Sequence, residues 1–309
     1  MFSCRHFELG SAIAALLLAA NLSACMALPA PQASNAEILG SWRASRPDGG
    51  LVLFEASRII IKEEGPARAV TVLDRRGDGW VVRNLGLKEV WRVRQTGKDL
   101  EIAQQNGSFQ SYSRLAQAPP ELDLNPLTLG DPKPLSVDSI NRIKEELLRR
   151  RDEDQAVRME ASRQKDQKTV DEANWRFLTQ LLQDVGWIDS ERFGAGATKA
   201  ALLLAKHTGD PRLMQAILPL AERDVQRKVI SGELYSVLYD GLQISLGQKQ
   251  KYGTQIAEDE AGPFVLPLAD PLEVDAYRSA IGLPPLQEYL ALASQTLFEG
   301  RQIRLGSAD

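Results

Sequence analysis

Residues 116–136 read "AQAPPELDLNPLTLGDPKPLS", and this stretch divides the chain into two parts of different pattern. Its prolines are Pro119, Pro120, Pro126, Pro132 and Pro134. Proline has no backbone N–H and fixes φ, so this spacing interrupts helices and strand ladders alike. We therefore expect a Pro-rich linker over 117–135, between a small all-β domain at 38–116 and a mostly α-helical domain at 136–309.

Before the linker, short apolar runs alternate with turn signals. Segments such as "GLVLFEASRIIIKE" and "RAVTVLDRRGDGWVVRNL" are rich in β-branched residues, and Asp-Gly, Thr-Gly and Asn-Gly pairs occur in this part. Such pairs favour the tight turns of β-hairpins. We expect about six to eight antiparallel strands, enough for a small barrel or a sandwich.

The first of these strands carries a short motif. Gly40-Ser41-Trp42 resembles the Gly-x-Trp of lipocalin-like barrels. That resemblance implies an interior able to hold an apolar ligand. The alternative is that Trp42, Trp80 and Trp91 fill the core, and we favour it because a barrel of roughly 80 residues encloses little space.

Beyond the linker, apolar residues recur at helical spacing almost to the C-terminus. Helices are expected to begin at three residues: Ser136, Asp210 and Asp270. Each of the two aspartates is followed by a proline. Their side chains can accept from the free amides of a first helical turn. We expect a multidomain α+β protein whose second domain is mostly helical.

The N-terminus has the pattern of an export signal. Its apolar run, "GSAIAALLLAANLSAC", is shorter than the roughly 20 residues that span a bilayer. Leu22-Ser23-Ala24-Cys25 resembles the lipobox of bacterial lipoproteins, whose cysteine carries a diacylglycerol and an acyl chain such as palmitate. The resemblance implies a signal peptide at 1–24, lipid on Cys25 and a lipid-anchored spacer at 25–37. The alternative is an ordinary secretory signal with a chance cysteine.

These features predict a protein of the bacterial cell envelope whose partner is a membrane, reached through the N-terminal lipid. Met26 after the cysteine favours the outer membrane, facing the periplasm, by analogy with enteric bacteria. Cys4 leaves with the signal, so no thiol pair remains for a disulfide. Loss of Arg5 and Glu8 leaves the formal net charge at -4, which argues against a nucleic-acid partner.

Several polar residues fall on helix faces that should be apolar. They are Asp154, Arg158, Asn174, His207, and the pair Asp275 and Arg278, one turn apart. Asp154 lies in the heptad series of its helix, and His207 is the one histidine of the mature chain. An unpaired buried polar group costs about 1–3 kcal/mol. Such positions therefore mark either a site or a paired network.

Around these positions the residues match a family. The segments "DEDQAVR", "VGW", "ILPL", "KYGTQ" and "VDAYRSAIGLPPLQEYL" resemble, in order and spacing, a bacterial family of unknown function, DUF6624. The resemblance covers Ile140 to Ala293 and implies no reaction. The matching positions are Asp154, Gln155, Arg158, Asn174, His207, Gln215, Tyr252, Gly253, Thr254, Gln255, Asp275 and Arg278. One departure is Gly241, which follows Asp240 where the family more usually has Arg.

A short hairpin is expected near the matching "KYGTQ". The segments "YGTQIAE" and "PFVLPL" flank a turn at 259–262. In that hairpin Tyr252, Thr254 and Ile256 would share one face, and Gly253 and Gln255 the other. The set would then be either a ligand-binding face or a core tyrosine beside the start of a strand.

Two kinds of function remain open. In the first, the protein is a non-catalytic envelope module whose polar positions fix helix packing or bind a peptide, a glycan or another small molecule. In the second it is an envelope hydrolase with carboxylate and arginine partners around a histidine; its catalytic candidates are His207, Asp154 and Asp275. The other matching positions are ligand-binding candidates in both. No phosphate loop, dinucleotide fingerprint or zinc motif occurs, so we expect no cofactor and no metal.

Overall fold

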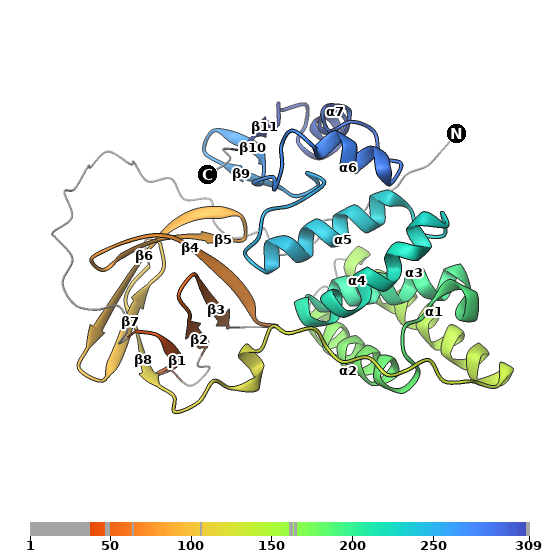
Figure 1. The fold of residues 1–309 in the computed structure, drawn as a ribbon, viewed down its shortest axis with the longest axis horizontal. Helices are drawn as coiled ribbons and strands as arrows, with labels where there is room; N and C mark the ends of the chain where they lie inside the picture. Colours follow the sequence, from red (N-terminus) through yellow and green to blue (C-terminus); the bar gives the residue numbers. More distant parts are fainter. Residues whose placement is uncertain are drawn as a thin grey trace.

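A closed barrel precedes a bundle of helices and a small three-stranded sheet in the computed structural model (Figure 1). The structure describes residues 38–306, except 47–49, 64, 106, 161–162 and 164–165. The expected signal peptide, Cys25 and the spacer lie outside the described residues. The predicted order, a small β domain followed by a mostly helical part, is confirmed.

Eight antiparallel strands form the barrel, each pairing with the next, and β8 closes it on β1. The strands are β1 Gly40–Ala44, β2 Leu51–Phe54, β3 Arg58–Lys62, β4 Arg68–Arg76, β5 Gly79–Asn84, β6 Leu87–Thr96, β7 Asp99–Ala103 and β8 Gln110–Arg114. Tight turns centred on Gly77, Gly86 and Gly97 join three of the hairpins, each glycine having a positive φ. The expected number of strands is confirmed, and of the two expected arrangements the barrel is found.

Side chains fill the interior of the barrel. Trp42, Trp80 and Trp91 are each fully buried, and Phe54 meets the Trp80 ring edge-on at 5.3 Å between centroids. These residues belong to one apolar cluster that spans the barrel. The interpretation in which the tryptophans fill a small core is therefore the one that the structure supports.

The helices begin mostly where the sequence predicted. They are α1 Val137–Met159, α2 Gln167–Val185, α3 Ser190–Thr208, α4 Pro211–Gln226, α5 Gly232–Ser245, α6 Val274–Ala280 and α7 Leu286–Leu297. Ser136 and Asp210 cap α1 and α4 as expected. Asp270 instead accepts from the amides of Leu272 and Glu273, which fold into a turn, so α6 begins only at Val274.

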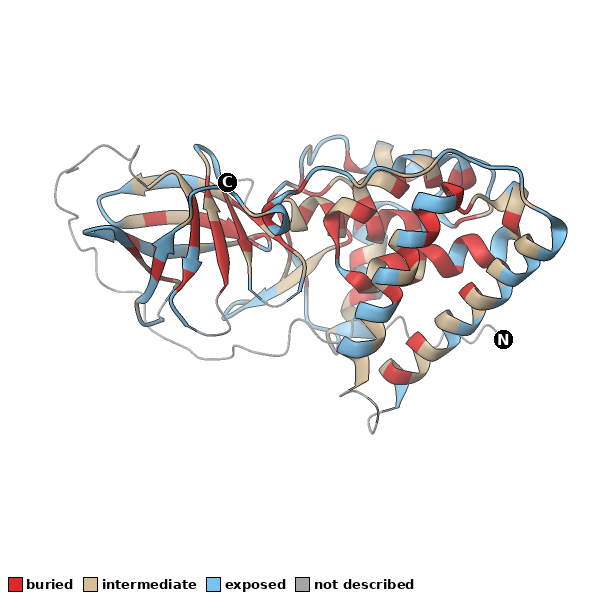
Figure 2. Ribbon diagram, turned by 90° about the horizontal axis from the view of Figure 1, so that it is seen from below, coloured by how far each residue is buried: buried red, intermediate tan, exposed pale blue. Residues whose placement is uncertain are grey.

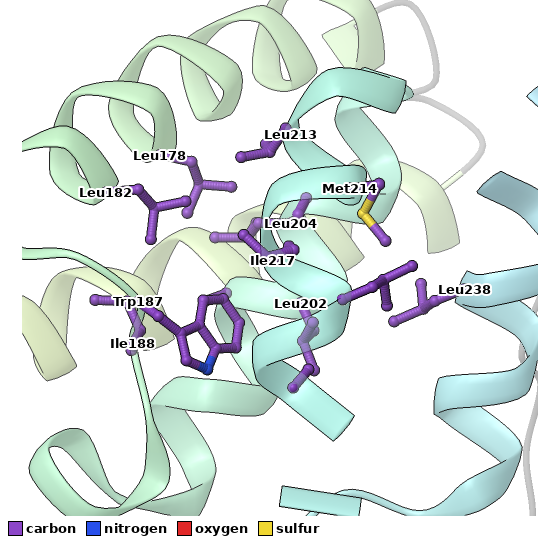
Figure 3. Close-up of a cluster of buried hydrophobic side chains, with 14 of the residues drawn as sticks. Leu178, Leu182, Trp187, Ile188, Leu202, Leu204, Leu213, Met214, Ile217 and Leu238 are labelled. Atoms are coloured by element: carbon purple, nitrogen blue, oxygen red, sulfur yellow. The ribbon is translucent and has the colours of Figure 1, made fainter. Parts of the chain in front are cut away.

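The predicted hairpin is present as β9 Ile256–Asp259 and β10 Gly262–Val265, and β11 Arg304–Leu305 adds a parallel third strand. In the helical part, buried residues lie on the inner faces of the helices (Figure 2). Figure 3 shows Leu178 and Leu182 of α2, Leu204 of α3 and Ile217 of α4 gathered in one core. This packing fixes the relative positions of α1, α2 and α3, which carry most of the unusual polar residues.

The Pro-rich segment is docked along the helical part. The amide of Leu127 donates to the carbonyl of Arg212 at 3.1 Å, and the amide of Gly130 donates to that of Leu182 at 2.9 Å. A Cβ on Gly130 would lie 1.9 Å from the carbonyl oxygen of Gln183, so only glycine fits there. The segment thus joins two domains and is also part of the second one.

A second interface joins the barrel to the end of α5. The Thr71 hydroxyl on β4 donates to the carbonyl of Gly247, and Leu246 packs with Ile60 on the outer face of the barrel. Gly247 has φ +72°, and a Cβ there would lie 2.7 Å from Thr71 Oγ1 and 3.2 Å from the Ala69 carbonyl oxygen. Close backbone contact therefore holds the two domains together.

Substitution of this glycine tests the interface. A side chain at φ > 0 costs about 1–2 kcal/mol by itself, and the clash with β4 in Gly247→Ala should add about 2 kcal/mol. Gly97→Ala is the matched control, because Gly97 has φ +65° and nothing lies within 4 Å of its Cβ position. We expect chemical denaturation to show the larger loss for Gly247→Ala. Equal losses in the two variants would mean that the interface is loose.

Candidate functional site

A buried carboxylate and a histidine meet where α1 packs on α3. Asp154 of α1 is fully buried, and its Oδ2 lies 2.7 Å from Nδ1 of His207 in the last turn of α3. Gln155 Nε2 donates to the same Oδ2 at 2.9 Å. The sequence placed both residues on interior faces, and the structure brings their side chains together.

Arg158 extends this pair to α2. Its Nη1 lies 3.0 Å from Asp154 Oδ1, close enough for an ion pair although not aligned for a hydrogen bond. Its Nη2 donates to Asp171 Oδ1 at 2.6 Å. Burial raises the pKa of Asp171, and the hydrogen bond from Arg158 opposes that rise. The guanidinium group thus bridges two carboxylates, one on α1 and one on α2.

Asn174 lies one turn further along α2. Its Oδ1 accepts from Arg150 Nη1 at 3.2 Å, and the residue is 2 % exposed. Its Nδ2 has no hydrogen-bond partner among the described residues. A buried amide donor without a partner is uncommon and calls for a water or a ligand group. We call Asp154, Arg158, Asp171, Asn174 and His207 together the polar seam.

The chemistry of the seam centres on the imidazole of His207. When the ring is neutral, a carboxylate at Nδ1 favours the tautomer that carries the proton there, and Nε2 is then an acceptor. The side chain is 13 % exposed, so an edge of the ring reaches the surface. Next to it, burial lowers the pKa of Lys206, and Arg158 lowers it further. The seam can therefore accept a proton or hydrogen bond from a ligand at Nε2.

A second polar cluster lies around Asp240 of α5. Its buried carboxylate accepts from the amides of Lys251 at 2.8 Å, Tyr252 at 3.0 Å and Thr254 at 2.9 Å. The Thr254 hydroxyl also donates to it at 2.9 Å. Burial raises the pKa of Asp240, opposed by hydrogen bonds led by the amides of Thr254 and Tyr252. The segment 251–254 is therefore wrapped around one carboxylate.

Arg278 closes this cluster from α6. It is 1 % exposed, its Nη1 donates to the Tyr252 carbonyl at 2.7 Å, and its Nε donates to the Pro284 carbonyl at 2.7 Å. Asp275 Oδ1 accepts from the amide of Leu286 at 2.7 Å. The expected pairing of Asp275 with Arg278 is thus wrong, because the backbone that follows α6 supplies partners for both. We call Asp240, Tyr252, Thr254, Gln255 and Arg278 the Asp240 network.

The expected shared faces of the hairpin are also wrong. β9 begins only at Ile256, because Tyr252 and Thr254 are drawn to Asp240 instead of pairing with β10. Tyr252 is buried, and its ring packs edge-on against Tyr239 at 5.5 Å. The set thus contributes to the core rather than to an open face.

The remaining candidates have separate places. Gly253 lies against Leu286, where a Cβ would come within 2.7 Å of Cδ1. Gln255 Nε2 donates to the Val237 carbonyl at 3.3 Å. Gln215 of α4 donates to the Leu124 carbonyl at 2.7 Å and so anchors the Pro-rich segment. The sequence candidates therefore divide into the polar seam, the Asp240 network and one linker contact.

Some participants were not predicted. Asp171 precedes Asn174 by one turn, so its helical spacing could have revealed it. Gln250 is fully buried and donates to the carbonyls of Gln255 and Leu266 at 3.0 and 2.7 Å. Nothing in its sequence surroundings distinguishes it from an exposed glutamine.

Two cavities lie elsewhere on the surface, and neither is lined by a residue of the polar seam or of the Asp240 network. One, of about 550 Å³, lies between α1 and α2 beside Arg150, and the other, of about 510 Å³, lies between the barrel, the Pro-rich segment and Gln215. The described residues contain no group of three or more His, Cys, Asp or Glu side chains arranged to hold a metal ion. In the same part of the chain, no helix combines the length and apolar character that crossing a membrane requires.

The chain thus consists of a filled β-barrel followed by a helical region that carries two buried polar networks. DUF6624, a family of unknown function, matches residues 142–298, half of the chain. The chain belongs to this family, which confirms the resemblance seen in the sequence. No curated protein and no solved structure matches the chain.

Proposed function

We propose that this protein is a lipoprotein of the bacterial cell envelope, anchored through Cys25 in the outer membrane and facing the periplasm, whose helical domain binds a small polar ligand. The lipobox-like sequence supports the anchor. The buried contact between Asp154 and Nδ1 of His207 supports the ligand site. The ligand classes that suit such a site are a peptide, a glycan or another small molecule.

The polar seam is a better ligand site than the Asp240 network. In the network, protein amides and a hydroxyl already occupy the carboxylate, and Arg278 is committed to two carbonyls. In the seam, Nε2 of His207 and Nδ2 of Asn174 have no partner among the described residues. The His207 ring edge reaches the surface, where a ligand can meet Nε2, whereas Nδ2 of Asn174 is buried. A polar group that leaves hydrogen-bonding capacity open inside a protein is costly unless a ligand or water completes it.

The barrel is a weaker candidate. Its eight-stranded meander suits the lipocalin-like resemblance, in which an apolar ligand would lie inside. Three fully buried tryptophans take up that space. We therefore place the ligand in the helical domain and assign the barrel to positioning it at the membrane surface.

The imidazole offers a direct test. Because His207 is the one histidine of the mature chain, histidine-specific isotope labelling yields a single NMR ring signal. We expect the ring to carry its proton on Nδ1 and its signal to shift when small peptides or oligosaccharides bind. In His207→Gln, binding should weaken about tenfold while the unfolding midpoint stays close to that of the parent chain. No shift with any peptide or oligosaccharide would contradict the proposal.

A second function, hydrolysis, is favoured by one observation. A carboxylate that holds one imidazole nitrogen and leaves the other at a partly exposed edge is the arrangement of a general base. A panel of esters, amides and phosphate esters tests it. Turnover that disappears in His207→Gln would support a hydrolase, and turnover that persists would exclude His207 from the reaction.

A further inference from the structure

The cavity between α1 and α2 is a groove with a charged side and an apolar floor. Arg150 and Arg176 supply the charge, and Phe177 and Leu181 supply the apolar surface. The Arg150 guanidinium carbon lies 4.1 Å from the centre of the Phe177 ring, so charge and apolar surface adjoin. Its volume is about 550 Å³, and it is widely open to solvent.

The charge beside Arg150 is only partly compensated. Its Nε donates to Glu146 at 2.7 Å, but Arg149 holds the same carboxylate with two hydrogen bonds of 2.8 Å. These contacts, led by the one from Arg149, lower the pKa of Glu146 to about 2, so this carboxylate stays ionised. Because Glu146 is shared by two guanidinium groups, the Arg150 end of the groove is positive, whereas Arg176 pairs with Glu172 at 3.7 Å and Asp184 makes the far end negative.

Arg150 also links the groove to the polar seam. Its Nη1 donates to Oδ1 of Asn174, the buried amide whose Nδ2 lacks a partner among the described residues. The Nη2 of Arg150 has no protein partner in that part of the chain either. Within the groove, the open donor is therefore Nη2 of Arg150, a guanidinium group that can bind an anionic ligand.

We propose that this groove binds an amphipathic carboxylate. The carboxylate takes the open donors of Arg150, and an apolar body such as a phenyl ring or short alkyl chain covers Phe177 and Leu181. This inference rests on the proposed function, because it names the ligand class of the helical domain. Asp184, at the far end of the groove, would face the end of the ligand away from the carboxylate.

Calorimetric titration with phenylbutyrate tests the proposal on the mature chain carrying Cys25→Ser, which receives no lipid. The neutral analogue, phenylbutanol, has the same apolar body without the charge. We expect phenylbutyrate to bind at least about tenfold more tightly than the alcohol at low salt. Equal affinities would overturn the proposal, because the groove would then recognise only apolar surface.

Two arginine variants locate the site. Arg150→Gln should weaken phenylbutyrate binding about tenfold, and Arg151→Gln should change it less than about twofold. Arg151 is on the same helix, pairs with Asp152 and does not line the groove, so it is the matched control. If Arg150→Gln unfolds, Arg150→Lys, which keeps charge without the planar fork, should give an intermediate loss. Equal losses in the Arg151 and Arg150 variants would overturn the site.

The NMR ring signal of His207 in the parent chain separates this proposal from the function on which it rests. Phenylbutyrate binding that depends on Arg150 but shifts no His207 signal would support the groove and contradict a ligand role for His207. A His207 signal that responds to peptides or oligosaccharides, while phenylbutyrate binds independently of Arg150, would overturn the groove and leave the seam as the site.

Discussion

Replacement of Asp240 by alanine is expected to lower the free energy of unfolding by about 4 kcal/mol. The carboxylate is fully buried and accepts from three backbone amides and the Thr254 hydroxyl. Alanine would leave these donors without an acceptor in the interior, where each unsatisfied group costs about 1–3 kcal/mol before relaxation. The segment 251–254 would lose the contact that shapes it, and Arg278 would lose a firmly placed partner in Tyr252.

Urea denaturation of the mature chain measures this loss. Asp240→Asn keeps one carbonyl oxygen and should lose about half as much, because some donors retain an acceptor. Glu260→Ala, at an exposed turn of the neighbouring hairpin, is the control and should change stability by less than about 0.5 kcal/mol. A loss below about 1 kcal/mol in Asp240→Ala would show that the network does not hold this loop.

Asp154→Ala is expected to cost about 3 kcal/mol, because it removes the shared partner of His207, Gln155 and Arg158. Breaking a buried ion pair leaves a charge without compensation, which typically costs about 3–5 kcal/mol. Asp171 still pairs with Arg158, so the loss of unfolding free energy should lie at the lower end of that range. The His207 ring should at the same time lose its fixed tautomer.

The control for Asp154 lies two residues earlier on the same helix. Asp152 pairs with Arg151 on the solvent side and is 68 % exposed, so Asp152→Ala should cost less than about 0.5 kcal/mol. Denaturation curves and the NMR ring signal of His207 would be recorded on both variants. A similar loss in both variants, or an unchanged tautomer in Asp154→Ala, would mean that the buried contact has little energetic weight.

Local patterns predicted the elements well because their causes are local. Alternation and turn pairs gave the strands, and Ser136 and Asp210 gave helix starts through their caps. Helical periodicity placed Asp154 inside, where it is fully buried. The same reasoning left barrel and sandwich open, because closure of β8 on β1 is a long-range pairing.

The site was harder to predict because its contacts join distant segments. One-turn spacing suggested that Asp275 and Arg278 pair, but backbone groups at Pro284 and Leu286 bind them instead. Alternation suggested that Tyr252 belongs to a strand, but the Asp240 carboxylate, on a different element, determines its position. Partner choice in both cases depends on loop paths that periodicity does not describe.

The docked Pro-rich segment lies outside the part of the chain that the family matches. Leu127, Leu129 and Leu135 pack against the core of the helical domain, although the family match begins only at residue 142. The part of this chain that the family matches is therefore shorter than the helical part together with the segment packed on it. A relative that keeps residues 142–298 without this segment must cover the same apolar surface with other sequence. The family match and the segment that packs on the helical core therefore begin at different residues of this chain.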